Sequence, residues 1–207
     1  MALRRWTWIL SGLCLASIAQ AAEPGFVPLF NGRDLSGWDG DLTLWKVVDG
    51  IIVGDSPGIK HNQFLKTKRS YEDFELRLEF RLKGGVGNSG VQFRSKSVEN
   101  STEVSGYQAD LGENYWGCLY DESRRNKTLA QADPKLKDVL NKDGWNDYVI
   151  RADGNRITLA INGVTTVDYR EEEAEIPRAG FIALQVHSGP PLRVEFRNLR
   201  IQELNTK

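Results

Sequence analysis

Cysteine is almost absent from this 207-residue sequence, and histidine is nearly so. The chain holds two cysteines, Cys14 and Cys118, and two histidines, His61 and His187. Cys14 lies in an N-terminal segment that we expect to be removed, so the mature chain keeps one cysteine and no intrachain disulfide can form. The sequence has no H-x-x-H pair and no cysteine cluster of the kind that binds structural zinc. The formal net charge of −1 gives no reason to expect nucleic acid as a partner.

A long apolar run is found only near the N-terminus. Arg4 and Arg5 precede a mostly apolar stretch over residues 6–18, and Ala19-Gln20-Ala21 follows as a small-x-small site. This order is typical of a secretory signal peptide, whose apolar core is too short for a comfortable membrane anchor. We therefore expect a signal peptide over 1–22, one domain over 23–207 without a membrane span, and a secreted or periplasmic protein.

The chain also lacks a Rossmann pattern, an internal repeat and a long amphipathic helix, and the patterns that remain are those of strands. Residues 76–82 alternate apolar with Glu or Arg, which predicts a half-buried strand, and residues 91–94 form the return strand. Asp49-Gly50 and Asn162-Gly163 each separate two apolar runs, the strongest short signal of a hairpin. About a dozen such strands predict an all-β fold, a jelly-roll sandwich of two antiparallel sheets.

Two irregularities interrupt the strand pattern. In the last strand, Val194 and Phe196 have one parity and Leu199 and Ile201 the other, so we expect a β-bulge near residues 197–198. Residues 121–144 are charged and read as a long loop insert carrying about two helical turns, and loops of this length are often lids.

Strand parity gathers polar side chains on one outer face of the predicted sandwich. Opposite apolar core residues lie three polar pairs: Gln92 with Arg94, Gln108 with Asp110, and Gln185 with His187. Tyr120 and Trp116 are expected close by. Amides offer both donors and acceptors, and aromatic rings stack on sugar faces, so this face suits a polyhydroxyl ligand.

Less specific interpretations remain open for several of these residues. Arg94 and Asp110 could form a solvated cross-strand ion pair, and His187 could simply end its strand. Asp110 and His187 are the candidate ligands of a divalent metal, with Glu113 or Asp121 as a third, although no metal motif supports them. No serine stands in a nucleophile-elbow context.

A series of motifs, taken in order, resembles the 3-keto-disaccharide hydrolase family over about residues 25–204. They are L-F-N-G-R-D-L-S-G-W, W-K-V-V-D-G, Y-E-D-F-E-L-R-L-E-F-R, G-N-S-G-V-Q-F-R, W-N-D-Y-V-I-R-A-D-G-N-R-I-T-L-A-I-N-G-V, G-F-I-A-L-Q-V-H-S-G and E-F-R-N-L-R-I. Much of the family has G-Y-E-x-Q where this chain has G-Y-Q-A-D at 106–110, which exchanges the acid and amide positions. The resemblance implies a concanavalin A-like fold, with the site on the concave sheet, and activity on glycosides oxidised to a ketone at sugar carbon 3.

A 3-ketone acidifies the hydrogen on carbon 2, so a base can remove it, the aglycone can leave carbon 1, and water can then add. This route needs a base, a proton donor and a group that stabilises the enolate. We assign Asp110 as the base, His187 as its acid/base partner and Arg94, or a metal in its place, as the enolate stabiliser. Gln92, Gln108, Trp116, Tyr120 and Gln185 would bind sugar.

Two other functions are consistent with the same residues. One is a lectin-like carbohydrate-binding module without catalysis, because this fold serves both purposes. The other is an ordinary glycosidase with two carboxylates, which would require Glu113 or Asp121 to turn toward Asp110.

Overall fold

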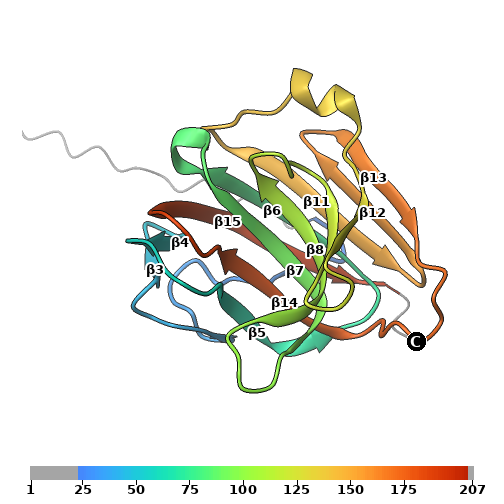
Figure 1. Cartoon of the computed structure of the whole chain (residues 1–207), viewed down its shortest axis with the longest axis horizontal. Coiled ribbons are helices and arrows are strands. Elements are labelled where there is room, and N and C mark those ends of the chain that lie inside the picture. The colour runs from blue at the N-terminus through green and yellow to red at the C-terminus, as the bar shows by residue number, and fades with distance from the viewer. Residues whose placement is uncertain (1–22, 205–207) are drawn as a thin grey trace, which may run out of the picture.

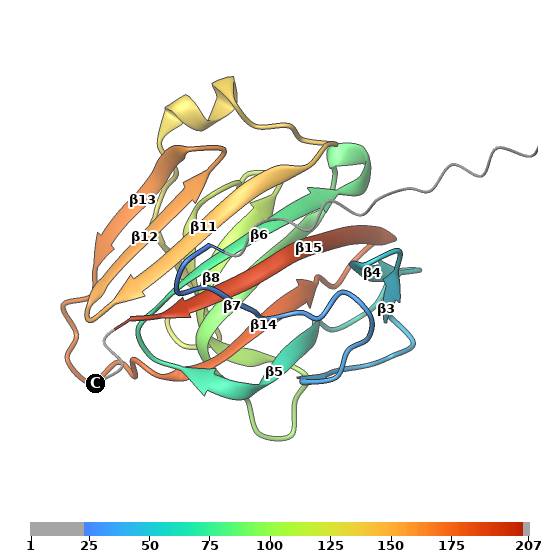
Figure 2. The ribbon, with the colours of Figure 1, turned by 180° about the vertical axis from the view of Figure 1, so that it is seen from behind.

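The chain folds into two antiparallel β-sheets packed face to face, which confirms the predicted all-β sandwich. The computed structural model describes residues 23–204, so the predicted signal peptide over 1–22 lies outside the described residues. Figure 1 views the molecule with β7, β8 and β14 toward the reader, and Figure 2 shows β6, β11 and β15 from behind. No helix among the described residues is long and apolar enough to cross a membrane.

The first sheet, here called sheet A, has eight strands in the order β13-β12-β11-β6-β15-β4-β3, with β1 paired to β15. Their bounds are β1 Val27–Pro28, β3 Trp45–Val48, β4 Ile51–Ser56, β6 Phe74–Leu82, β11 Asn146–Asp153, β12 Arg156–Ile161, β13 Val164–Arg170 and β15 Leu192–Glu203. The second sheet, here called sheet B, has seven strands in the order β10-β9-β8-β7-β14-β5-β2. Their bounds are β2 Trp38–Asp39, β5 Gln63–Tyr71, β7 Asn88–Ser97, β8 Val104–Gly112, β9 Leu119–Glu122, β10 Lys127–Ala130 and β14 Gly180–Val186.

Strand β6 shows why the alternating sequence forms this sandwich. Phe74, Leu76, Leu78, Phe80 and Leu82 are all buried, and the Glu and Arg residues between them are partly exposed. Because side chains alternate across a strand, the apolar set faces sheet B and the charged set covers the outside of sheet A. One continuous apolar cluster fills the space between the sheets.

The turns and the bulge form where the sequence predicts them. Asp49-Gly50 joins β3 to β4, and Asn162-Gly163 joins β12 to β13, all four with positive φ as a two-residue hairpin turn needs. The register of β15 against β6 shifts between Arg197 and Arg200, and Asn198 has a φ of 54°. The bulge lets both parities of β15 face the core.

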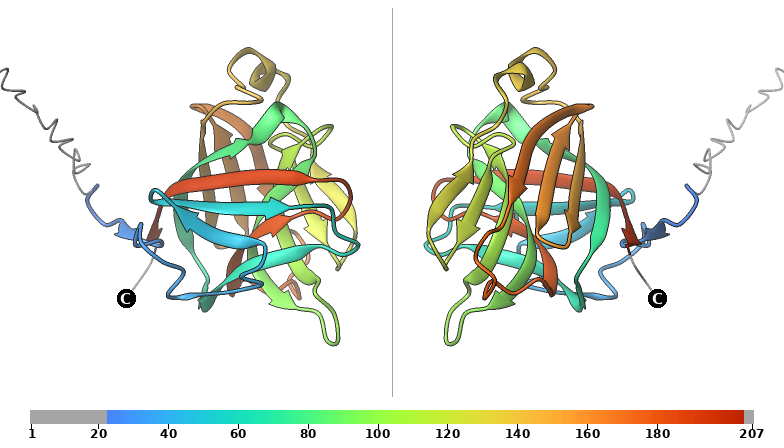
Figure 3. Two further views of the ribbon diagram at one scale, coloured as in Figure 1. Left: turned by 90° about the vertical axis from the view of Figure 1, so that its left-hand side faces the viewer. Right: turned by 90° about the vertical axis from the view of Figure 1, so that its right-hand side faces the viewer.

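The prediction of a long loop over 121–144 is wrong for its first part. Residues 119–130 form the hairpin β9–β10, which extends sheet B at its edge. The helical part is one short 3₁₀ turn, η2 (Pro134–Asp138), which buries Leu136 and contacts β13. Figure 3 shows this turn at one end of the molecule, away from the β7–β8 connection.

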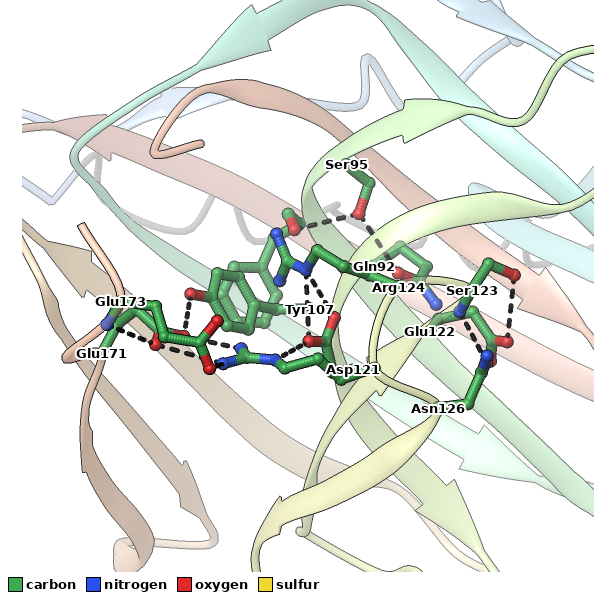
Figure 4. Close-up of polar contacts among 12 residues, drawn as sticks. Gln92, Ser95, Tyr107, Asp121, Glu122, Ser123, Arg124, Asn126, Glu171 and Glu173 are labelled. Carbon is green, nitrogen blue, oxygen red and sulfur yellow. Dashed lines mark hydrogen bonds and ion pairs between the residues drawn. The ribbon is translucent and has the colours of Figure 1, made fainter. Parts of the chain in front are cut away.

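Charged side chains also join the two sheets beside β9. Arg125, just after β9, forms ion pairs with Asp121 of β9 and with Glu171, which follows β13. The Tyr107 hydroxyl of β8 donates to Glu171 at 2.7 Å. Figure 4 shows Tyr107, Asp121 and Glu171 within this network. Because Asp121 and Glu171 are buried, the pairs act in a medium that screens charge less than water does.

Candidate functional site

A polar pocket lies on the face of sheet B that points away from the core. Its volume is about 200 Å³. The lining residues are two aromatic side chains and six polar ones: Tyr115, Tyr120, Asn62, Asn88, Gln108, Asp110, Glu122 and His187. Parity thus correctly placed Gln108, Asp110, Tyr120 and His187 together, although they come from three different parts of the chain.

Gly90 creates the space in which the polar side chains of β8 lie. It pairs with Asp110 in the register of β7 against β8. A Cβ atom at Gly90 would lie 2.6 Å from both Cγ and Cδ of Gln108. With no side chain at this position, Gln108 can fold over β7 and reach Asp110, so the glycine is required by packing.

Three hydrogen bonds form a chain that ends at Asp110. The Ser95 hydroxyl donates to Gln92 Oε1 at 3.1 Å, Gln92 Nε2 donates to Gln108 Oε1 at 2.5 Å, and Gln108 Nε2 donates to Asp110 Oδ1 at 2.9 Å. Each amide uses its oxygen to accept and its nitrogen to donate, so the direction of the chain is fixed. The carboxyl oxygen of Asp110 is therefore held as an acceptor.

The surroundings of Asp110 make its carboxyl group a weak acid. The residue is 3% exposed. Burial, and to a smaller extent the charge of Glu122, raise the pKa of Asp110, and hydrogen bonds from Gln108 and Asn88 oppose the rise. The resulting pKa is about 8. A carboxylate with this pKa is a far stronger base than an ordinary aspartate, which is a property of catalytic groups.

Glu122 brings a second carboxyl group to the pocket. Burial raises the pKa of Glu122, as does the charge of Glu103, and His187 opposes the rise. His187 lies just beyond β14, with Nδ1 2.6 Å from the carbonyl oxygen of Ser188. A carbonyl only accepts, so Nδ1 carries a proton and Nε2 is the ring nitrogen free for a ligand.

Of the two aromatic side chains predicted at the site, Tyr120 lines the pocket and Trp116 does not. Tyr115 and Tyr120 line the pocket, and their rings lie edge to face with centroids 6.5 Å apart. Trp116, predicted to bind sugar beside Asp110, instead stacks on Phe80 of the core and lines a separate groove near η2. The neighbouring residues Tyr115 and Trp116 of the β8–β9 turn point to opposite sides, so Tyr115 takes the place in the pocket that was predicted for Trp116.

The prediction that Arg94 shares the face of Gln92 is wrong. Arg94 has a φ of 48°, and the register of β7 against β8 shifts between Phe93 and Lys96, so the bulge reverses the side chain. Its guanidinium donates to the carbonyl of Glu72 at 2.8 Å, the carbonyl of Gly154 at 2.8 Å and the carboxylate of Asp73 at 2.7 Å. Arg94 therefore ties β7 to the β5–β6 turn, which joins the two sheets, and to the β11–β12 turn of sheet A. It does not line the pocket.

Gln92 and Gln185 lie beneath the pocket surface and do not line it. Both are 0% exposed. Gln92 belongs to the chain that holds Gln108, whereas the amide nitrogen and oxygen of Gln185 have no hydrogen-bond partner among the described residues. Contact of either side chain with a sugar would require the residues above it to move.

The candidate metal ligands do not form a three-ligand set. Among residues 23–204, no group of three or more His, Cys, Asp or Glu side chains is placed to hold a metal ion. Glu113 is exposed on the β8–β9 turn, and Asp121 is paired with Arg124 and Arg125. The third ligand predicted for Asp110 and His187 is therefore missing.

Sequence reasoning missed Asn62, Asn88, Tyr115 and Glu122. Glu122 could have been found from parity, because it lies two residues after Tyr120 in β9 and pairs with Gly106. Because residues 121–144 were expected to form a loop insert, strand parity was not applied to Glu122. Asn62 lies in a loop, donates to the carboxylate of Glu103 and accepts from the backbone N–H of Ser188. No local sequence pattern predicts that such a loop residue lines the pocket.

Comparison with known sequences identifies one family. The family profile described as a 3-keto-alpha-glucoside-1,2-lyase-like domain matches residues 25–202. No curated protein sequence resembles the chain closely enough to count as a relative.

Comparison with solved structures supports the fold. A provisionally assigned glycosyl hydrolase from Parabacteroides distasonis matches with a TM-score of 0.67 at 20% identity, over 87% of this chain and 94% of that one. The carbohydrate-binding module CBM66 from Bacillus subtilis matches with a TM-score of 0.64 at 17% identity, over 81% and 96%. A Bacillus subtilis protein with a galectin-like fold matches with a TM-score of 0.65 at 13% identity, over 86% and 94%.

Proposed function

Because the chain belongs to the 3-keto-alpha-glucoside-1,2-lyase-like domain family, we propose that it cleaves 3-keto-glycosides by elimination followed by hydration. The observation that carries this proposal is the buried carboxyl of Asp110, whose pKa is raised to about 8 inside a polar pocket of sheet B. Removal of a proton next to a ketone is faster with a stronger base, whereas sugar binding alone needs no base.

In the proposed reaction, the Asp110 carboxylate removes the proton from carbon 2 of the 3-keto sugar. The electrons form a C1–C2 double bond as the C1–O bond to the aglycone breaks, and the leaving oxygen takes a proton. Water then adds across the double bond, with hydroxyl to carbon 1 and a proton to carbon 2, which gives the free 3-keto sugar. Gln108 and Gln92 hold Asp110 in position, and Tyr115 and Tyr120 offer ring faces to the sugar.

The proton for the leaving oxygen would come from Glu122. Burial raises its pKa, which keeps the acid form present at a higher pH than for an ordinary glutamate. His187 takes the position at the ketone that Arg94 cannot reach, because it is the side chain of the pocket lining able to carry a positive charge.

Aglycones of different acidity separate these two roles. Glu122→Gln should lose about 10²-fold or more in turnover with an alkyl aglycone and much less with a nitrophenyl aglycone, which leaves without a proton. His187→Gln should lose activity equally on both substrates. Equal losses for Glu122→Gln on both aglycones would remove Glu122 from the role of acid.

The function itself is tested with a 3-keto-glucoside and the matching unoxidised glucoside. Release of aglycone from the keto compound alone is expected. The same assay with a chelator determines whether a divalent ion takes part. Cleavage of the unoxidised glucoside would instead favour an ordinary glycosidase, which the shared pocket of Asp110 and Glu122 makes the second candidate. Inertness toward both, with sugar binding detected by calorimetry, would favour a binding module.

The proposed site of action is outside the cytoplasm. The basic, apolar and small-residue regions of residues 1–22 support an exported protein. N-terminal sequencing of the protein made in its native host should find a mature chain beginning at about residue 23.

A further inference from the structure

A second cavity lies at the far end of β7 and β8 and shares no lining residue with the pocket of Asp110. Its volume is about 140 Å³. Three of its lining residues are basic and three carry a hydroxyl group: Arg94, Lys96, Arg124, Ser95, Ser105 and Ser123. Pro177 and Ala179 complete the wall, so no lining residue carries a carboxylate. The cavity lining therefore combines cations and hydroxyl groups, and the aspartates that pair with Arg94 and Arg124 lie outside the lining.

Arg124 presents a donor that nothing in the described protein satisfies. Its Nε donates to the two carboxylate oxygens of Asp121 at 2.9 and 3.1 Å, and its guanidinium lies over the ring of Tyr107 at 4.6 Å. Figure 4 shows Arg124 close to Asp121 and Tyr107. These contacts fix the plane of the guanidinium, yet Nη2 is buried and has no hydrogen-bond partner among residues 23–204. A buried guanidinium N–H without an acceptor is rare and unfavourable.

Positive charge is concentrated around this donor. Burial lowers the pKa of Arg94, and repulsion from Arg178 lowers it further, although the charge of Asp73 opposes the change. The neighbouring Lys96 is exposed, so its ammonium can turn toward the cavity. Arg94 already uses its guanidinium on Asp73 and two carbonyls. The hydroxyls of Ser95 and Ser123 donate to Gln92 and Glu122. The donors left for a ligand are therefore those of Arg124 Nη2, Lys96 and Ser105.

We propose that this cavity binds a small oxyanion, with Arg124 Nη2 as the donor that selects it. A carboxylate, sulfate or phosphate group supplies the acceptor that Arg124 lacks and the negative charge that the basic lining favours. Two sources have this chemistry. One is a free inorganic anion, and the other is the acidic group of a sugar derivative.

The test is a titration of ¹⁵N-labelled protein with sodium sulfate, followed by NMR at constant ionic strength set with sodium chloride. Saturable shifts are expected at the backbone amides of Ser95, Lys96, Ser105 and Ser123. Arg124→Lys keeps the charge but removes the Nη2 donor, and should weaken sulfate binding by about tenfold. Lys96→Gln, on an exposed side chain, should weaken it by about twofold to threefold.

Arg156→Gln is the matched control, because Arg156 is an exposed arginine of β12 paired with Asp168 and lies outside the cavity. It should leave sulfate binding unchanged. Shifts that do not saturate, or equal affinity in wild type, Arg124→Lys and Lys96→Gln, would overturn the proposal. If Arg124→Lys does not fold, two results still test whether the cavity binds sulfate. They are the affinity of Lys96→Gln relative to the wild type and the positions of the backbone amides whose chemical shifts change.

Parallel titrations with sodium phosphate and sodium glucuronate distinguish the two sources. Tighter binding of glucuronate than of sulfate would assign the cavity to an acidic sugar, and the reverse order would assign it to a free anion. Failure of all three anions to give saturable shifts at the cavity would contradict the proposal. None of these outcomes depends on cleavage of a 3-keto-glycoside, so the proposed reaction is tested separately.

Discussion

The carboxyl group of Asp110 is almost fully buried and accepts a hydrogen bond from the amide of Gln108 at 2.9 Å. An aspartate in an unfolded chain has a pKa of about 3.9, whereas the pKa of Asp110 in the folded chain is about 8. As the pH rises from about 4 to 8, the folded state keeps a proton that the unfolded state has lost, so ionisation of Asp110 progressively destabilises the fold.

Asp110→Asn should therefore abolish turnover and stabilise the protein. The loss of the base should cost about 10²-fold or more in kcat. The free energy of unfolding should equal that of the wild type near pH 4 and exceed it by about 2 kcal/mol or more at pH 9, since the ionisation cost is removed. Denaturant unfolding at several pH values measures this difference. A stability gain that is the same at every pH would show that ionisation of Asp110 is not its cause.

In the wild type, ionisation of the same group should control activity. The acid limb of kcat/KM should rise with pH, reach half of its maximum near pH 8 and level off above it, because only the carboxylate can remove a proton. A plateau that begins near pH 5 would contradict the assignment of Asp110 as the base.

Gln92 affects the proposed reaction by orienting Gln108, and it does not contact the ligand itself. Gln92→Met keeps the side-chain length but leaves Gln108 Oε1 without the donor it accepts from, at a cost of about 1–3 kcal/mol in stability. The Ser95 hydroxyl still has the carbonyl of Phe93 as an acceptor. Because Gln108 then loses its fixed direction, kcat should fall several-fold while KM changes little. Met at this position with unchanged kcat and a raised KM would instead indicate direct substrate contact.

At the scale of elements, bulges decide which side chains enter the pocket. The bulge in β7 turns Arg94 away from Asp110 and toward the turns that hold Glu72, Asp73 and Gly154. Strand parity is a local rule that assumes an unbroken strand, and one extra residue reverses it. The sequence signalled the bulge of β15 through its changed parity but gave no such signal in β7, where Gln92 and Arg94 are both polar.

Arg94→Ala should therefore be a stability variant with little effect on the reaction. Removing the buried guanidinium breaks its pair with Asp73 and frees two backbone carbonyls, so the free energy of unfolding should fall by about 3 kcal/mol or more. The kcat/KM of the folded variant should stay within about twofold of the wild type. Loss of turnover in protein shown to be folded by circular dichroism would restore Arg94 to the reaction.

Across the whole molecule, two buried acids make stability depend on pH in opposite directions. Burial alone would raise the pKa of Glu171, but hydrogen bonds from Arg125 and Tyr107 outweigh it and lower the pKa to about 2. Glu171 thus stabilises the fold above its unfolded pKa of about 4.3, and this contribution is lost as the pH falls toward 2. Together with Asp110, it predicts greatest stability near pH 4 to 5.

Glu171→Gln should make the acid side of this profile shallower, because the variant has no proton to take up between about pH 4 and 2. Asp168→Asn is the control: Asp168 also pairs with an arginine, but the pair is exposed and should contribute little. Melting temperatures measured from pH 2 to 6 test the prediction. If the melting temperature falls equally steeply with decreasing pH in both variants and the wild type, the ion pairs of Glu171 are not the cause of the acid sensitivity.

The sequence by itself determined the two-sheet architecture, the hairpin turns, the charged outer face of β6 and the grouping of Gln108, Asp110, Tyr120 and His187. Each of these follows from strand periodicity or turn chemistry, which act over a few neighbouring residues. Only the tertiary structure decided that Arg94 and Trp116 leave the pocket, that Asn62, Asn88, Tyr115 and Glu122 enter it, and that Asp110 is buried. The physical reason is that bulges, loop paths and burial depend on contacts between segments far apart in the chain, and these contacts also set the pKa of Asp110.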